Sequence, residues 1–158
     1  MKTEPAELRH RLDEFKTGLK RAGVKVTHQR LEIFQEVAKS GDHPDAVTIY
    51  KAVRKRLPTI SLDTVYRTLW LLLDLGLIST LGAQNKVRFD GNMRQHHHFV
   101  CTNCSTTYDF YDSAFNVLKI PDAVQALGHV EKTQVEFTGL CLRCKQHRPS
   151  HQPKLLTQ

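Results

Sequence analysis

Apolar side chains recur every three or four positions through most of the first half of the chain, which predicts amphipathic helices. Gly23 and Gly76 stand where the first and fourth helices would end, and Thr27 and Ser61 are suitable N-caps for the second and fourth. Pro44 stands near the first turn of the third, where a missing N–H is tolerated. The four predicted helices cover residues 5–22, 28–40, 44–57 and 62–75.

After Gly76 the apolar period changes from helical to strand-like. The following residues predict two short strands, 77–82 and 86–89, joined by a turn at residues 83–85. This order of elements, four helices followed by a hairpin, is that of a winged helix-turn-helix domain. We therefore predict a winged-helix DNA-binding domain over residues 1–90.

In a domain of this kind the later helix enters the major groove, where base edges can be distinguished. The fourth helix carries Thr64, Tyr66, Arg67 and Thr68 as polar residues that can face DNA while its leucines face the core. The same division into a polar and an apolar face is also found in ordinary amphipathic helices whose polar face is solvated, and this is the alternative interpretation. Basic residues elsewhere could contact phosphates or could simply be solvated: Lys20, Arg21, Lys25, Arg30 and Lys86.

The second part of the chain is predicted to be a small α/β domain. Strand-like runs, "HFVCTN" and "STTYDFY", precede a helix that begins near Pro121 and ends at Gly128, and a strand is predicted within residues 129–141. Few core residues are present, so a metal ion or a partner chain should stabilise this domain. The predicted fold class is α+β, with a winged-helix domain at 1–90, a hinge at 91–95, the second domain at 96–147 and a disordered tail at 148–158.

Charge is distributed unevenly along the chain. Residues 1–90 hold 16 Lys and Arg against 11 Asp and Glu, whereas residues 91–158 hold 7 against 5. A basic half favours a polyanionic partner such as nucleic acid, although many basic proteins bind none. No apolar run approaches the roughly 20 residues that span a bilayer, and the first residues lack the apolar core of a secretion signal. We therefore expect a cytoplasmic protein without membrane contact.

The cysteines occur only as two Cys-x-x-Cys pairs. Four thiolates in this arrangement suit a closed tetrahedral site for structural Zn²⁺, which would tie the start of the second domain to its end. Two redox dithiols or disulfides are the alternatives, and a cytoplasmic chain without a thioredoxin-like βαβ lead-in favours them less. The predicted zinc ligands are Cys101, Cys104, Cys141 and Cys144.

Histidines and aspartates predict a second metal site without sulfur. His96 and His98 alternate along a strand and so share one face, with His97 on the other. Asp90 precedes the hinge, Asp109 lies on the next strand and His43 lies at the start of the third helix. Nitrogen and oxygen ligands favour Fe²⁺, Mn²⁺ or Zn²⁺, and an incomplete shell would leave a position open to small reagents. Solvated histidines are the alternative interpretation.

Several sequence motifs, in their order and their spacing along the chain, resemble those of the ferric uptake regulator family of bacterial metal-dependent repressors. They are "VTHQRLEIFQEV", "SLDTVYRTLWLL", "VRFD", "HHHFVCTNC" and "CLRC", and the resemblance covers roughly residues 10–146. It implies a homodimer that binds palindromic double-stranded operator DNA through winged helices, with the C-terminal domain serving dimerisation. It also implies a regulator and not an enzyme.

Carried over position by position, the resemblance makes the four cysteines the structural zinc ligands. It assigns the regulatory metal, Fe²⁺ or Mn²⁺, to a ligand set drawn from both domains: His43, Asp90, His96, His98 and Asp109. The ion would therefore bridge the two domains and favour the DNA-binding arrangement.

The residue at position 109 points to one branch of the family. Iron-sensing members commonly have a glutamate there, whereas the peroxide-sensing repressors have an aspartate, as this chain does at Asp109. The resemblance thus implies a peroxide-responsive repressor, in which iron-catalysed oxidation of His43 and His96 releases metal and DNA. The ligand positions of a further, peripheral family site read Gln95, His97, Asn116 and Thr133, of which only His97 could ligate.

Other interpretations stay open at this point. An iron-responsive uptake regulator, or one responding to zinc or manganese, would have the same fold, and His97, His147 and His151 are spare histidines that we expect to be solvated. A catalytic metal site would need a further acid or base, and none is evident. A zinc-ribbon RNA-binding module would leave the long helical first half unexplained.

Overall fold

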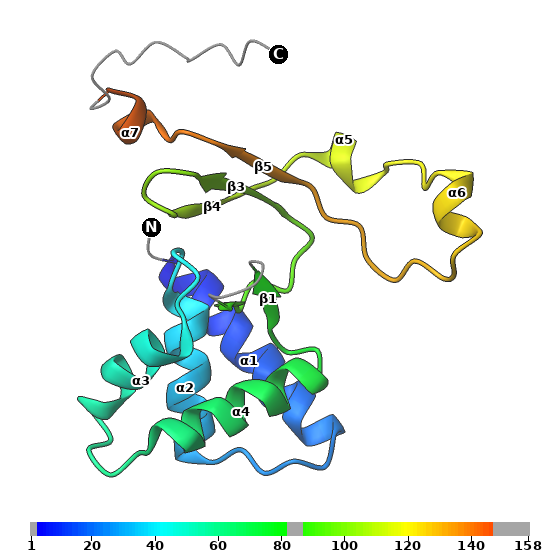
Figure 1. The fold of residues 1–158 in the computed structure, drawn as a ribbon. Helices are drawn as coiled ribbons and strands as arrows, with labels where there is room; N and C mark the ends of the chain where they lie inside the picture. Colours follow the sequence, from blue (N-terminus) through cyan, green and yellow to red (C-terminus); the bar gives the residue numbers. More distant parts are fainter. Residues whose placement is uncertain (1–2, 82–86, 147–158) are drawn as a thin grey trace. The chain divides into compact units, whose positions relative to one another are not determined.

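The computed structural model describes residues 3–81 and 87–146, and the chain divides into two compact units, Met1–Arg94 and Gln95–Gln158 (Figure 1). The N-terminal unit is helical with a short hairpin, and the C-terminal unit is built on a three-stranded sheet. The predicted α+β fold class is confirmed. Within the described residues no helix is both long and apolar enough to cross a membrane.

The first, second and fourth N-terminal helices begin and end within one residue of the predicted bounds. The Thr27 hydroxyl accepts the Arg30 backbone N–H at 3.3 Å, and the Ser61 hydroxyl accepts the Thr64 N–H at 3.0 Å, so both predicted N-caps are confirmed. The four helices are α1 (Pro5–Arg21), α2 (His28–Lys39), α3 (Ala46–Arg54) and α4 (Leu62–Asp74).

The third helix begins later than predicted. Asp45 is its N-cap, because its side chain accepts the Thr48 N–H at 2.7 Å. Hydrogen bonds from Thr48, first from its side chain and then from its backbone, lower the pKa of Asp45. Pro44 lies outside the helix, and its carbonyl accepts the Phe89 N–H at 3.0 Å. The chain before α3 is thereby fastened to the hairpin strand that carries Phe89.

Within the described residues, the first hairpin strand begins two residues later than predicted, and the second ends one residue later. Strand β1 (Ser79–Leu81) pairs antiparallel with β2 (Arg88–Asp90), with Thr80 opposite Phe89. The turn predicted at residues 83–85 and the tail predicted at residues 148–158 lie outside the described residues.

A single hydrophobic core joins the helices and hairpin of the N-terminal unit. The Phe15 and Phe34 rings stack with their centroids 4.3 Å apart and join α1 to α2. Helix α4 contributes Val65, Leu69 and Leu72, all fully buried, so its opposite face is directed to solvent.

The C-terminal unit is a three-stranded sheet in the order β4-β3-β5. Strand β3 (His97–Cys101) pairs antiparallel with β4 (Thr107–Phe110) and parallel with β5 (Glu136–Gly139). Three short helices accompany it: α5 (Ser113–Asn116), α6 (Asp122–Gln125) and α7 (Leu142–Gln146).

The sequence pattern predicted the helices and strands of the C-terminal unit less well than those of the N-terminal unit. The helix predicted to run to Gly128 is the single turn α6, the strand predicted within 129–141 is only β5, and α5 and α7 were not predicted. Leu127 and Val117 remain 87% and 80% exposed, so these apolar residues do not build a core that would extend the elements. Packing against β3 decides where β5 begins and ends.

Gly91 lies where the chain passes close to the backbone of α2. A Cβ atom at this position would stand 2.9 Å from the Ala38 Cα and 3.1 Å from its backbone nitrogen. Both atoms belong to a helix backbone, which cannot rotate away as a side chain can. Glycine at 91 therefore allows the chain that follows Asp90 to pack directly on α2.

We expect Gly91→Ala to destabilise the N-terminal unit by about 1–3 kcal/mol, because the added methyl group overpacks a backbone contact. Thermal unfolding measures the loss. Gly139→Ala is the matched control, since its Cβ would meet the Phe99 ring at an ordinary 3.4 Å. Equal melting temperatures for the two variants would contradict the close contact.

Candidate metal centres and DNA-binding surface

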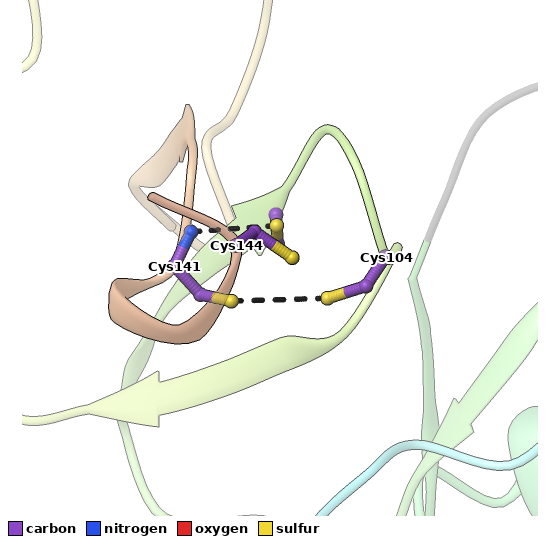
Figure 2. A group of neighbouring side chains, drawn as sticks. Cys104, Cys141 and Cys144 are labelled. Carbon is purple, nitrogen blue, oxygen red and sulfur yellow. Dashed lines mark hydrogen bonds between the residues drawn. The ribbon is translucent and has the colours of Figure 1, made fainter. Parts of the chain in front are cut away.

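The four cysteines converge at one end of the C-terminal sheet. Their Sγ atoms lie within 4.8 Å of one another, and Cys104 Sγ and Cys141 Sγ are 3.8 Å apart. Figure 2 shows the sulfurs of Cys104, Cys141 and Cys144 directed toward a common centre. A tetrahedral ion with Zn–S bonds of about 2.3 Å separates its sulfurs by about 3.8 Å. The sulfur positions therefore suit a four-thiolate metal site.

Backbone hydrogen bonds bring the two Cys-x-x-Cys pairs together. Around the first pair, Cys101 N–H donates to the Thr106 carbonyl at 2.9 Å, and Ser105, with a φ of 56°, closes the turn by donating to the Cys101 carbonyl at 2.8 Å. Pairing of β3 with β5 sets Cys101 beside Gly139, two residues before Cys141. Cys141, which follows Cys101 by 40 positions in the sequence, thus becomes its neighbour in the fold.

The pKa values of two of these thiols are shifted in opposite directions. Hydrogen bonds from Thr106, first its hydroxyl and then its backbone N–H, lower the pKa of Cys104 to about 5. The Asn103 amide, 3.3 Å from Cys144 Sγ, lowers the pKa of that thiol, but Cys141 and burial outweigh it and raise the pKa to about 11. Four thiolates this close repel one another, so a bound divalent cation is what allows all of them to ionise.

A basic side chain accompanies the thiols. Hydrogen bonding to Cys104 and attraction to the neighbouring sulfurs raise the pKa of Arg143. Arg143 lies inside the second Cys-x-x-Cys, as Asn103 lies inside the first. Neither was predicted as part of the site, although the two positions enclosed by each cysteine pair are the natural place to look for groups that surround a metal site.

Three nitrogen and oxygen donors converge within the C-terminal unit. His96 Nε2 and His98 Nε2 are 2.9 Å apart, and Asp109 Oδ1 lies 3.5 Å from the latter and 3.9 Å from the former. The register explains this arrangement, because His98 is paired with Asp109 across β3 and β4. These separations are those between neighbouring ligands of one ion at about 2.1 Å from each.

Two further donors lie together within the N-terminal unit. His43 Nε2 is 3.7 Å from Asp90 Oδ1, at the end of β2. The loop that carries His43 is fastened to this strand, since the Arg88 side chain donates to the Asp42 carbonyl at 3.2 Å. His43 itself has a φ of 48°, a left-handed conformation that costs energy for a residue other than glycine and that often marks a functional position.

The middle histidine of the three-residue run is a structural residue. The expectation that His97 is solvated is wrong, because it is fully buried between Phe110 and Phe115, with ring centroids 5.5 Å from each. Its Nδ1 accepts the Val135 backbone N–H at 3.2 Å, so the neutral ring carries its proton on Nε2 and donates to Asn116 Oδ1 at 3.0 Å. With both nitrogens engaged, His97 has none to offer a metal.

Gln134 is a partner of the histidine pair that sequence reasoning missed. Its carboxamide lies 3.0 Å from His98 Nδ1. A metal on Nε2 needs the proton on Nδ1, and an amide turned to present its oxygen would accept that proton. No local pattern distinguishes Gln134, because its place beside His98 depends on how the segment before β5 packs.

The predicted DNA contacts lie in different parts of the N-terminal unit. Arg30, Thr64 and Arg67 line one depression of about 390 Å³ between the start of α2 and α4, together with Thr27, Gln29, Thr68 and Leu71. Thr68, which was predicted to face DNA, is buried, with 7% of its surface exposed. Tyr66 is exposed on α4. Lys20 and Arg21 lie in the last turn of α1.

Comparison with known proteins places the chain among regulators. A family model described as "Ferric uptake regulator family" matches residues 21–137. The peroxide-responsive repressor PerR of Staphylococcus epidermidis is 32% identical over 152 residues, which cover 92% of this chain and 98% of that protein.

Solved structures share the fold. The ferric uptake regulator Fur of Helicobacter pylori superposes with a TM-score of 0.70 at 22% identity, covering 95% of this chain and 99% of that one. The Vibrio cholerae Fur structure has a TM-score of 0.63 at 27% identity, covering 80% and 98%.

Proteins of this family are metal-dependent transcription regulators that bind operator DNA as dimers, and they are not enzymes. The matched residues include α4, the histidine run and the first cysteine pair. From this match and from the two sets of converging donors, we conclude that the chain belongs to the ferric uptake regulator family.

Proposed function

We propose that this protein is a peroxide-responsive repressor that binds palindromic operator DNA as a homodimer in the cytoplasm. The observation that carries the proposal is the aspartate at 109, held with His96 and His98 in a donor set that contains no thiol. The 32% identity to proteins named peroxide-responsive repressors supports it.

The regulatory metal, Fe²⁺ or Mn²⁺, is proposed to take ligands from both units: His43, Asp90, His96, His98 and Asp109. Each unit holds part of this set by itself, and the segment 91–95 is the proposed hinge. An ion that is fully ligated in only one arrangement of the units favours that arrangement by its difference in affinity, and a tenfold difference is worth about 1.4 kcal/mol.

Zn²⁺ is the proposed ion of the four-cysteine site. It would give this small unit stability that its short strands and exposed apolar residues do not provide. Zinc would also keep the thiols from acting as the peroxide sensor, because an exposed, free thiolate is what such a sensor needs. Peroxide is therefore proposed to act at the histidines.

The histidine rings are the proposed targets of oxidation. A bound Fe²⁺ would activate H₂O₂ beside its ligands and would return to its starting oxidation state, so both oxidising equivalents of the peroxide would be used on the ring. His43 or His96 would gain one oxygen atom to become 2-oxo-histidine, and the second oxygen of the peroxide would leave as water. An oxidised ring is a poorer ligand, so the preference for the DNA-binding arrangement would be lost.

DNA recognition is proposed to use the exposed face of α4 in the major groove. Thr64, Tyr66 and Arg67 would contact base edges, and the cations of Lys20, Arg21 and Arg30 would contact phosphates. A dimer would place two such helices about one helical turn apart, which a palindromic operator requires.

An uptake regulator that responds to iron, zinc or manganese is the second candidate. The same nitrogen and oxygen donors bind all three ions, and the fold is shared with the Vibrio cholerae ferric uptake regulator. Peroxide chemistry, not fold or DNA binding, separates this candidate from the first.

Removing one thiol should release the structural ion. We expect Cys104→Ser to lose zinc and to lower the melting temperature of the C-terminal unit, because three sulfurs cannot close the tetrahedral site. Elemental analysis and thermal unfolding measure both effects. Full zinc content in this variant would exclude Cys104 as a ligand.

Anaerobic loading with Fe²⁺ followed by a slight excess of H₂O₂ should oxidise the ligand histidines. We expect one added oxygen on the peptides that contain His43 or His96, located by peptide mass spectrometry. Protein loaded with Mn²⁺ is the control and should stay unmodified. Iron-loaded protein without histidine oxidation would favour the uptake regulator over the peroxide sensor.

Asp109→Glu tests the branch assignment at a single residue. The longer carboxylate keeps the charge and the ligand type, so metal-dependent DNA binding should persist while histidine oxidation falls at least several-fold. Gel-shift titration with Mn²⁺ and mass spectrometry after peroxide measure the two properties. Unchanged oxidation in this variant would show that Asp109 does not distinguish the branches.

A further inference from the structure

The single tryptophan of the chain lies on the exposed face of α4. Trp70 is 53% exposed, an unusual state for the largest apolar side chain. At 100° per residue it lies on one stripe with Tyr66 and Arg67, the residues proposed to contact bases. Asp63 and Asp74 lie on the same stripe and are also exposed.

The orientation of this stripe is set by the core. Val65, Leu69 and Leu72 are fully buried on the opposite side of α4, so the helix cannot turn Trp70 inward without exposing them. Any molecule that docks on the exposed face of α4 must therefore cover the indole ring.

The chemistry of the stripe favours base edges over phosphates. Asp63 and Asp74 would repel phosphates that approached along it, and Asp63 lies 3.5 Å from Arg67 in an ion pair. Arg30, a cation suited to phosphates, lies to one side, in the depression between α2 and α4. The indole is thus an apolar part of a surface on which Arg67 is paired with Asp63 and Arg30 lies at the margin.

Resting on the proposed DNA-binding function, we propose that Trp70 reads thymine in the major groove by apolar contact with its 5-methyl group. Trp70 follows the first residue of α4 by eight positions, or about 12 Å along the axis, which is comparable to the width of the groove. The thymine methyl is the apolar group that the groove presents, and an exposed indole is complementary to it.

The test uses full-length protein loaded with zinc and Mn²⁺ and a duplex that the wild type selects from a random pool. Affinities are measured for wild type, Trp70→Ala and Trp70→Phe, on this duplex and on versions with single thymines replaced by deoxyuridine. Val47→Ala is the matched control, because Val47 is 40% exposed on α3, away from the stripe.

We expect one or two deoxyuridine substitutions to weaken wild-type binding roughly fourfold each, the effect of one methyl group removed from apolar contact. Trp70→Ala should bind the unmodified duplex more weakly and lose this sensitivity, while Trp70→Phe keeps part of it and Val47→Ala keeps all of it. Binding should also change the emission of the single tryptophan. Melting temperatures of the exposed-site variants should match the wild type.

Two results would overturn the inference and leave the DNA-binding function intact. One is equal affinity of Trp70→Ala and wild type for the selected duplex. The other is a deoxyuridine effect of the same size in both proteins, which would place the methyl contact on another residue. A wild-type protein that selects no duplex at all would instead remove the proposed function, and the inference with it.

Discussion

The central position of β3 in its sheet is the constraint on which the chemistry of the C-terminal unit depends. Antiparallel pairing with β4 sets Asp109 beside His98, and parallel pairing with β5 brings the second cysteine pair to the first. One five-residue strand, His97–Cys101, thus contributes to both the histidine and aspartate set and the cysteine set. A shift of β4 by one residue would turn Asp109 to the face opposite His98, and a shift of β5 would displace the second cysteine pair from the first.

His97 shows how that strand is held in place. Its two ring nitrogens join β3 to the segment before β5 and to α5, and its ring packs between two phenylalanines. Because side chains alternate along a strand, a residue fixed on one face directs its neighbours, His96 and His98, to the other. The fold thus gives three consecutive histidines two different roles. His97 packs in the C-terminal unit, whereas His96 and His98 are placed where they suit metal binding.

Donor type and charge separate the two centres. Hydrogen bonds from Thr106 lower the pKa of Cys104, whereas Cys141 and burial outweigh Asn103 and raise that of Cys144. Four thiolates this close would repel one another, and a divalent ion would relieve this repulsion. The histidine and aspartate set lacks sulfur and suits ions that also exchange and react.

The sequence by itself determined the N-terminal helices, their caps at Thr27 and Ser61, and the residue types of the candidate donor sets, because caps, amphipathic periods and Cys-x-x-Cys spacings are local. It could not determine the late start of α3, the single turn of α6 or the burial of His97, since each depends on contacts between distant segments. Only the tertiary structure decided that Gln134 lies beside His98 and that Asn103 lies beside Cys144. Those distances depend on strand pairing, and the energy of pairing is not contained in any short stretch of the chain.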